Sequence, residues 1–322
     1  MALLAIDIGG TKIALGIFTP EGILQHDYRV AINARKGKEV GALITEEILK
    51  LVNSSIYSGQ IHAIGICVPG ISRRRTGTVW APNIEGWEDY PLLNEVQAAV
   101  PQIPVTIESD RACYILGETW KGNAVGCSDA IFFAVGTGIG LGILSDGTIL
   151  GGAHGISGAV GWMALDRPFI DAYSKCGCLE YHASGSGIAN RAREEIQNDN
   201  TYAGRLKDKA AQALTSHDVF EAFEQKDPIA AKIIDNCIGL WGMAIANLVS
   251  FMNPEKIIFG GGVFGPATKF IPQIRAEAAK WAQPVSIGLV TMEPSLLGVN
   301  AGVYGAGHMA LQLVTAANNR RS

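Results

Sequence analysis

The chain has 322 residues, of which 48% are hydrophobic and 17% are charged, and this composition excludes a disordered protein because it supplies apolar surface for sizeable cores. At about 150 residues per domain, the length predicts two domains. The 26 lysine and arginine residues against 30 aspartate and glutamate residues give a net charge of −4, which excludes a broad basic surface for nucleic acid.

Glycine is unusually frequent, with 39 residues in the chain, where ~7% is typical. The glycines follow no collagen period and form no low-complexity segment. We therefore expect them to mark tight turns and places where the backbone approaches another group closely.

The sequence also bears on the compartment. The start, MALLAIDIGG, has no basic segment, and Asp7 interrupts its apolar residues, so we expect no secretory signal. No stretch is expected to reach the ~18 uncharged apolar residues of a membrane span, so we expect none. Of the six cysteines, only Cys176 and Cys178 are clustered, which is not a disulfide framework. We expect a cytoplasmic protein.

The first part of the chain predicts alternating strands and helices. Strands are expected at Leu3–Ile8, Lys12–Thr19, Ile23–Val30, Ala63–Val68 and Val105–Ile107. Helices are expected at Glu39–Val52 and Ala112–Trp120.

A similar series begins again at Asp129. Strands are expected at Ala130–Val135, Gly140–Leu144, Thr148–Leu150, Lys256–Phe259 and Val285–Thr291. Helices are expected at about 179–199, 217–225, 228–252, 266–282 and 300–317. A strand, a glycine turn, a second strand and a hairpin thus occur twice, with no linker between the series. This pattern predicts two compact α/β lobes.

The first glycine turn carries an acid before it and a base after it. The residues of this motif are Asp7, Gly9, Gly10, Thr11 and Lys12. Glycine N–H groups in such a turn can form an anion-binding concavity, and a nearby aspartate can hold hydrated Mg²⁺. An ordinary glycine hairpin is the alternative interpretation.

Two further glycine turns could also bind an anion through their backbone N–H groups. They consist of Gly136, Thr137 and Gly138, and of Gly260, Gly261 and Gly262. The exposed amides and threonine hydroxyl of the earlier turn suit a phosphate, although a plain hairpin has the same pattern. The later turn lies between a strand and a helix, where the helix N-terminus favours a nucleotide. The G-x-G-x-x-G and P-loop patterns are absent, which disfavours a nicotinamide cofactor and a P-loop enzyme.

Glu108, Ser109 and Asp110 follow a short strand and open a helix. At such a junction Asp110 can accept a proton from a substrate hydroxyl during phosphoryl transfer. Capping of the helix by Ser109 or Asp110 is the simpler interpretation on spacing alone.

Together these motifs resemble the ROK (repressor, open reading frame, kinase) family of sugar kinases and glucokinase-like proteins, within the actin-like ATPase superfamily. Asp7–Lys12 looks like the family's first phosphate loop, Thr137 with its glycines like the second, and Gly260–Gly262 like the adenosine loop. Segments 66–70, 81–87 and 151–161 also follow the family's order. The resemblance covers about residues 3–310.

The resemblance implies an α/β, two-lobed actin-like ATPase fold (ribonuclease H-like) with an active-site cleft between the lobes. The smaller lobe would contain residues 1–120 and 300–322, and the larger lobe residues 121–299. Family members are often dimers, so a homodimer is implied. No nucleic-acid or membrane partner is expected. Repressors of the family carry an N-terminal helix-turn-helix, for which we expect no room before Asp7.

The implied activity is that of an ATP-dependent carbohydrate kinase, with ATP and Mg²⁺ as cofactors. Asp110 would be the base that activates a primary hydroxyl, and Asp7 would hold Mg²⁺ through water. The three glycine turns would bind the nucleotide. The sugar contacts would come from Asn83, Glu108, Ser109, Asp110, His154 and Glu180. A non-catalytic or weakly active sugar-binding regulator of the same family is the alternative.

The sequence departs from the family at the sugar site. The usual Glu-Asn-Asp is Glu108-Ser109-Asp110, a sugar-binding carboxylate is replaced by Ala159, and a histidine is replaced by Trp162. Each polar group left unpaired costs roughly 1–3 kcal/mol. We therefore expect poor binding of glucose and an acceptor that is a modified hexose, amino sugar or cyclitol. Trp162 would stack on a ring or fill the emptied zinc region.

The family's zinc motif is also altered. Only Cys178 matches a ligand position, Cys176 is out of register, and Asp171 and Tyr173 stand where two ligands belong. This is a poor tetrahedral site, so we expect no structural zinc. Packing of residues such as Trp162, Phe169 and Tyr173 would then hold this part of the lobe, and His182 would be structural.

Overall fold

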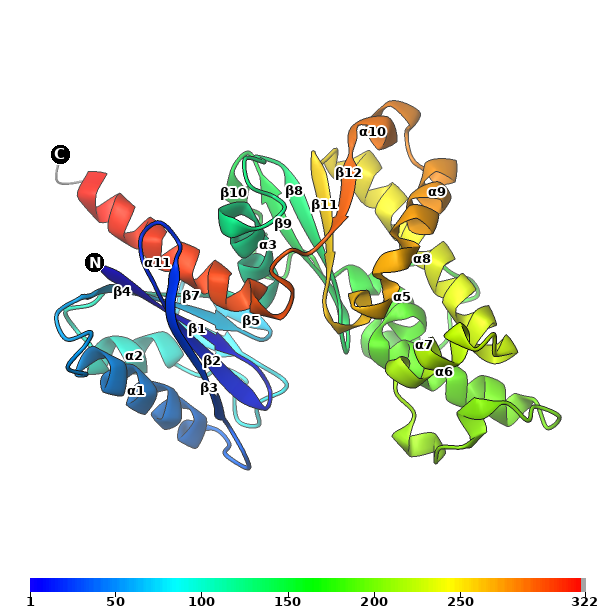
Figure 1. Ribbon diagram of the computed structural model, residues 1–322, viewed down its shortest axis with the longest axis horizontal. Coiled ribbons are helices and arrows are strands. Elements are labelled where there is room, and N and C mark those ends of the chain that lie inside the picture. Colours follow the sequence, from blue (N-terminus) through cyan, green and yellow to red (C-terminus); the bar gives the residue numbers. More distant parts are fainter. Residues whose placement is uncertain (320–322) are drawn as a thin grey trace.

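The computed structural model describes residues 1–319 and contains two five-stranded sheets in separate halves of the molecule (Figure 1). The strand order is β3-β2-β1-β4-β7 in one sheet and β10-β9-β8-β11-β12 in the other. Each sheet joins an antiparallel three-stranded meander to two parallel strands. The repeated organisation predicted from the sequence is therefore present as a repeated topology.

The strands of the two sheets are β1 Ala2–Ile8, β2 Lys12–Phe18, β3 Leu24–Ala31, β4 Ile61–Val68, β7 Val105–Ser109, β8 Ala130–Val135, β9 Ile139–Ser145, β10 Thr148–Ile149, β11 Lys256–Gly260 and β12 Thr291–Pro294. A separate hairpin contains β5 Ile71–Arg73 and β6 Thr78–Trp80. The α-helices are α1 Lys38–Val52, α2 Leu92–Ala99, α3 Asp110–Lys121, α4 Tyr173–Cys176, α5 Cys178–Ala183, α6 Gly185–Asn198, α7 Ser216–Glu224, α8 Pro228–Met252, α9 Ile271–Trp281, α10 Pro284–Leu289 and α11 Ala301–Asn319.

Helices cover both faces of the first sheet. In β1, Leu4 and Ile6 lie in a core with residues of α1 and α2, whereas Leu3 and Ala5 lie in a core with residues of α3 and α11. Successive side chains of a strand point to opposite faces, so a nearly continuous apolar strand requires cover on both sides. This burial fixes the register of β1 and hence the position of Asp7 near its end.

Close glycine contacts join α3 and α11. A Cβ atom added to Gly305 would lie 1.9 Å from the carbonyl oxygen of Cys113, and one added to Gly117 would lie 2.5 Å from that of Ala301. On another side of α3, a Cβ atom on Gly142 of β9 would lie 2.0 Å from the carbonyl oxygen of Arg111. The helix that begins at Asp110 is therefore packed against elements of both halves.

The second sheet packs against α8, which is 25 residues long and begins with Asp227 as its N-cap and Pro228 at its first turn. This helix is long and apolar enough to cross a membrane by length and composition, so the expectation that no stretch reaches this limit is wrong. Most of its apolar window is buried in the core, and core helices meet the same criterion.

Several predicted elements need correction. The expected strand at Val285–Thr291 is wrong, because Gln283 caps a helix with Pro284 in its first turn and the strand begins only at Thr291. The expected helix at 179–199 is two helices, separated at Ser184, which caps the second. The helix α2 and the hairpin strands β5 and β6 were not predicted from the sequence.

Candidate functional site

Asp110 is the first residue of α3 and follows β7 directly. The hydroxyl of Ser109 caps the helix by accepting from the backbone N–H of Ala112 at 3.5 Å. One carboxylate oxygen of Asp110, Oδ1, accepts from the N–H of Arg111 at 2.8 Å. Ser109 thus takes the cap role, and Asp110 lies in the first turn, where the helix dipole favours a negative charge.

The surroundings of Asp110 change its acidity. Burial raises the pKa of Asp110 to about 6, while the charge of Arg111 and the bond from its N–H act in the opposite direction. Asp7 raises this pKa further, and a hydrogen bond from the Tyr114 side chain lowers it. A carboxylate with a pKa near neutrality is a more effective general base than an ordinary aspartate. Sequence analysis did not identify Tyr114, which lies one helical turn after Asp110.

This raised pKa predicts the acidic limb of the pH–rate profile. A general base is active only when deprotonated, so kcat/KM should fall as the pH decreases through about 6. An unperturbed aspartate would place that limb near pH 4. Steady-state kinetics between pH 4.5 and 8.5 would measure it, and a rate that stays constant down to pH 4.5 would contradict the assignment.

Asp7 and Asp110 lie at the same end of the first sheet, where β1, β4 and β7 have their carboxyl ends. Asp7 pairs with Cys67 of β4, and Cys67 pairs with Glu108 of β7, so β4 separates the two aspartates. Two strand spacings correspond to about 10 Å. Burial raises the pKa of Asp7, while a hydrogen bond from Cys67 and the charges of Arg29 and Lys12 lower it. The carboxyl ends of these strands thus hold two acids separated by β4.

The first glycine turn lies next to the predicted sugar contact Asn83. The N–H of Gly9 donates to the carbonyl of Lys12 at 2.9 Å and closes the turn. A Cβ atom on Gly10 would lie 3.5 Å from Cβ of Asn83. Thr11 and Lys12 are exposed. The fold therefore brings Asn83 beside the predicted phosphate loop, although more than 70 residues separate them in the chain.

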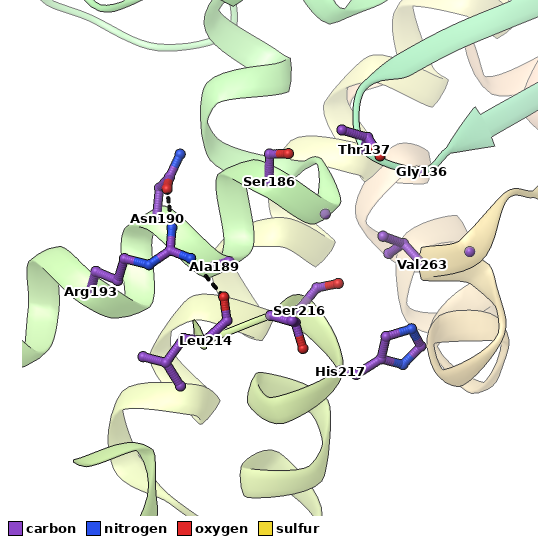
Figure 2. A pocket seen from close by; sticks show the side chains of 13 residues that line it. Gly136, Thr137, Ser186, Ala189, Asn190, Arg193, Leu214, Ser216, His217 and Val263 are labelled. Carbon is purple, nitrogen blue, oxygen red and sulfur yellow. Dashed lines mark hydrogen bonds between the residues drawn. The ribbon is translucent and has the colours of Figure 1, made fainter. Parts of the chain in front are cut away.

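A pocket of about 600 Å³ opens at the second glycine turn. Its lining comes from the β8–β9 turn, α6, the start of α7 and the segment after β11 (Figure 2). The residues are Gly136, Thr137, Gly185, Ser186, Ala189, Asn190, Arg193, Leu214, Thr215, Ser216, His217, Gly262 and Val263. Its volume is in the range of small-molecule and cofactor sites.

Hydrogen bonds fix the N-terminus of α6 against this glycine turn. The N–H of Gly185 donates to the carbonyl of Gly136 at 2.8 Å, and that of Ser186 donates to the carbonyl of Thr137 at 3.3 Å. In another part of the lining, Arg193 donates to Asn190 and to the carbonyl of Leu214, as Figure 2 shows. A helix N-terminus beside exposed turn amides suits an anion such as phosphate.

The three glycines of the third turn differ in their surroundings, because two pack against other residues and one lines the pocket. Space beside Gly260 is filled by the ring of Phe132, and Gly261 has a φ of 86° and lies against the carbonyl of Val135. Only Gly262 of this trio lines the pocket, and among the described residues no atom other than those of its chain neighbours lies within 4 Å of the position that its Cβ would take. Two of the three predicted nucleotide glycines are thus needed for packing and backbone conformation.

The pocket also contains residues that sequence analysis missed, among them Ser186, Asn190 and His217. They lie on amphipathic helices, where polar side chains are expected on any solvent-facing side. One signal was available, namely the Gly185-Ser186-Gly187 sequence at a helix start, because small residues mark close backbone contacts. Here Gly185 lies against the carbonyl of Gly136 in the second glycine turn.

Filling the pocket at Gly136 should weaken nucleotide binding. Apart from its chain neighbours, no atom of residues 1–319 lies within 4 Å of the position that a Cβ would take, so Gly136→Val should fold and place its methyl groups in the pocket. We expect the KM for ATP to rise about 10-fold or more, as for other steric losses of a few kcal/mol. Gly288→Val, also in open space but outside the pocket, is the control. An unchanged KM in Gly136→Val would exclude this pocket as the nucleotide site.

The remaining predicted sugar contacts have different surroundings. Glu180 Oε2 accepts from the N–H of Ile139 at 2.7 Å, and burial raises the pKa of this carboxyl. Glu108 is engaged elsewhere, because its Oε2 accepts from Nε of Arg74 at 2.9 Å and from Nη2 at 2.5 Å. Ser109 is buried and His154 is exposed.

The region of the altered zinc motif is organised around Tyr173, which is only 6% exposed. Its hydroxyl lies 2.7 Å from Nε2 of the buried His182. Within residues 1–319, no three His, Cys, Asp or Glu side chains gather as a ligand set. Of the three residues expected to hold this lobe by packing, Tyr173 is buried, and Phe169 contacts its ring edge-on but is 70% exposed. For Trp162 the expectation is wrong, because its side chain is 57% exposed.

The sequence of the chain is similar to those of known proteins. The sequence model of the ROK family matches residues 3–313. The chain is 32% identical over 316 residues to a glucokinase of Halalkalibacterium halodurans, covering 95% of this chain and 94% of that protein. It is 29% identical over 319 residues to a putative xylose repressor of Caldicellulosiruptor sp., covering 96% of this chain and 78% of that protein.

A similar solved structure is a ROK family glucokinase from Streptomyces griseus in complex with glucose and AMPPNP. The TM-score is 0.75 and the sequence identity is 27%, with 97% of this chain and 100% of that chain covered.

Proposed function

The chain belongs to the ROK family and has its two-lobed actin-like fold, and we propose that it is an ATP-dependent kinase that phosphorylates a hydroxyl of a hexose or modified hexose. The observation that carries this proposal is the pair Asp7 and Asp110 at one end of the first sheet, together with the glycine turns. Relatives named glucokinase support a sugar as acceptor.

Asp110 would accept the proton of the attacking hydroxyl, because its raised pKa and its position at the helix start suit a general base. Glu180 would bind hydroxyls of the sugar through the oxygen that Ile139 leaves free. Asn83 would contact the sugar from beside the first glycine turn. Closure of the two lobes would exclude water and align the reactants.

ATP fits the pocket of about 600 Å³, because Gly136 and Gly262 leave open space and the capped start of α6 lies beside it. Asp7 fits Mg²⁺, since this ion is held by one or two carboxylates together with water and substrate phosphates. Bound there, Mg²⁺ would neutralise charge on the transferred phosphate. Thr11, Lys12 and Thr137 are exposed beside these groups and would contact phosphate oxygens.

The proposed smaller lobe consists of residues 1–120 and 300–322, of which 320–322 lie outside the described residues, and the larger lobe of residues 121–299. The α3–α11 contact would then belong to the smaller lobe, with β9 meeting α3 across the boundary. We also propose a cytoplasmic location and a homodimer, in line with the family.

The acceptor would differ from glucose near Ala159 and Trp162. The chain has no carboxylate at 159, and the exposed Trp162 offers a flat apolar face to a ring. A modified hexose, an amino sugar or a cyclitol would need fewer hydroxyl contacts there.

A coupled ADP-release assay tests the proposal. The panel would contain glucose, mannose, fructose, their N-acetyl or amino forms, and cyclitols. We expect acceptor-dependent ADP release with a modified sugar preferred over glucose in kcat/KM. Glucose as the best acceptor would overturn the specificity. Sugar binding in calorimetry without ADP release for any acceptor would instead favour a regulator, a role that the match to a putative xylose repressor represents.

A further inference from the structure

The positive charge of Arg111 lies at a position that the protein by itself does not stabilise. It follows Asp110 in the first turn of α3, where the helix dipole opposes a positive charge. Its side chain is half-buried, and Nη2 donates to the carbonyl of Gly70 over a long 3.3 Å. Within the described residues 1–319, its guanidinium forms no ion pair. A guanidinium carries five N–H donors, so most of them stay available.

The stem of Arg111 extends toward the glycine-rich segment of the other half. A Cβ atom on Gly140 of β9 would lie 2.8 Å from Cδ of Arg111 and 3.8 Å from the carbonyl oxygen of Gly158. Arg111 and Gly158 therefore flank the same point on β9. The segment that follows, Gly158–Trp162, contains no acid that could pair with a guanidinium.

The acids around this point already have partners. Glu108 binds Arg74, and Glu180 accepts from the N–H of Ile139. Asp110 accepts from the N–H of Arg111 and forms no ion pair with its guanidinium. Among the residues that the structure describes, a fixed positive charge thus lies beside the proposed base without a carboxylate in contact with it. An anion from a ligand would complete this site.

We propose that Arg111 recognises an anionic substituent, either a carboxylate or a phosphate ester, on the acceptor sugar. The planar guanidinium matches both groups through two parallel hydrogen bonds, which also fixes the orientation of the ring. Arg111 adjoins Asp110 in the chain, so one acceptor can place its hydroxyl at the base and its anion at the guanidinium. This inference rests on the proposed kinase function and narrows its substrate class.

Matched acceptors test the inference, each pair retaining a primary hydroxyl. Glucose against glucose 1-phosphate tests the phosphate ester, and glucosamine against muramic acid tests the carboxylate. We expect the wild-type protein to prefer at least one anionic member by about 10- to 100-fold in kcat/KM, the range of a hydrogen-bonded charged group. The readout is the ratio of kcat/KM for the anionic and the neutral member of a pair, because a change in the pKa of Asp110 caused by losing the charge of Arg111 affects both members alike. Arg111→Gln should bring this ratio close to one, and Arg111→Lys should retain part of the preference.

Arg75→Gln, an exposed arginine, is the control for a general loss of positive charge. Neutral members that are used as well as the anionic ones by the wild-type protein would overturn the inference. So would an equal loss for both members in Arg111→Gln, because Arg111 would then act on the transferred phosphate or on Asp110.

Binding measurements separate this inference from the proposed function. Calorimetry of glucose 1-phosphate with wild-type and Arg111→Gln protein needs no turnover. Loss of binding in the variant supports the site even if no acceptor is phosphorylated, in which case the kinase proposal alone fails. Equal binding in both proteins, with unchanged melting temperatures, contradicts the site.

Discussion

Asp110→Asn should lower kcat for sugar phosphorylation by about 10²- to 10⁴-fold, the usual contribution of a general base. Asparagine retains the size of the side chain and can still accept from the N–H of Arg111, so the helix start should persist. It cannot take the proton of an attacking hydroxyl. ADP release measures the rate, and calorimetry with a non-hydrolysable ATP analogue should show nearly unchanged nucleotide binding.

Asp146→Asn is the matched control for this substitution. Asp146 is exposed in the turn after β9 and has a φ of 48°, a conformation that asparagine also tolerates. It should retain full activity. Turnover in Asp110→Asn close to that of Asp146→Asn would contradict the role of Asp110 as the base.

Gly305→Ala should have a large effect on stability. The new Cβ would lie 1.9 Å from the carbonyl oxygen of Cys113 and 2.6 Å from its Cα, which are backbone atoms of α3 and cannot rotate away. The helices α3 and α11 would have to separate. We expect a loss of about 3 kcal/mol in the free energy of unfolding, the upper part of the range for overpacking.

Denaturant unfolding would measure this loss, with Gly239→Ala as the control. Gly239 lies in the middle of α8, and apart from the nearby backbone of α8 itself no described atom lies within 4 Å of the position its Cβ would take. Alanine there should raise stability by about 0.5–1 kcal/mol, its advantage over glycine inside a helix. Equal stability of Gly305→Ala and the wild-type protein would show that α3 and α11 are not rigidly packed.

The packing of α3 against α11 should also affect activity. Asp110 begins α3, and Gly302 near the start of α11 leaves space for the carboxylate of Asp7, since a Cβ there would lie 2.5 Å from Oδ2. The packing that stabilises the protein therefore also positions both acids of the candidate site.

Most of the fold could be predicted from the sequence because its sheets are regular. The apolar runs at Leu3–Ile8 and Ala130–Val135 became β1 and β8, since strands covered on both faces have this composition. The segment from Val285 misled the prediction, because its β-branched and apolar residues are typical of strands. Local capping by Gln283 and the proline at the first turn determined the helix instead.

The candidate site was predictable where glycines and acids adjoin strand ends. Gly136 and Gly262 line the pocket, and Asp110 begins its helix, as their positions in the sequence suggested. The pocket walls from α6 and α7 were not predictable, because polar residues on a helix do not indicate which neighbour they face. Likewise, the sequence does not show that Arg74 would engage Glu108, since 34 residues separate them.

The exposed side chain of Trp162 has a similar explanation. A tryptophan in place of a histidine suggests that a large ring fills a space, but Gly177 approaches so closely that its Cβ would lie 2.6 Å from Cα of Trp162. The backbone itself occupies that space, and the ring points outward with 57% of its surface exposed.

Transfer of ³²P from γ-labelled ATP to the acceptor is the direct measure of the proposed kinase activity. Wild-type protein, ATP, Mg²⁺ and the sugar panel would be incubated and the products separated by charge. We expect a labelled sugar phosphate with the wild-type protein and almost none with Asp110→Asn. Release of label only as inorganic phosphate, or equal labelling of a sugar by the variant, would contradict it.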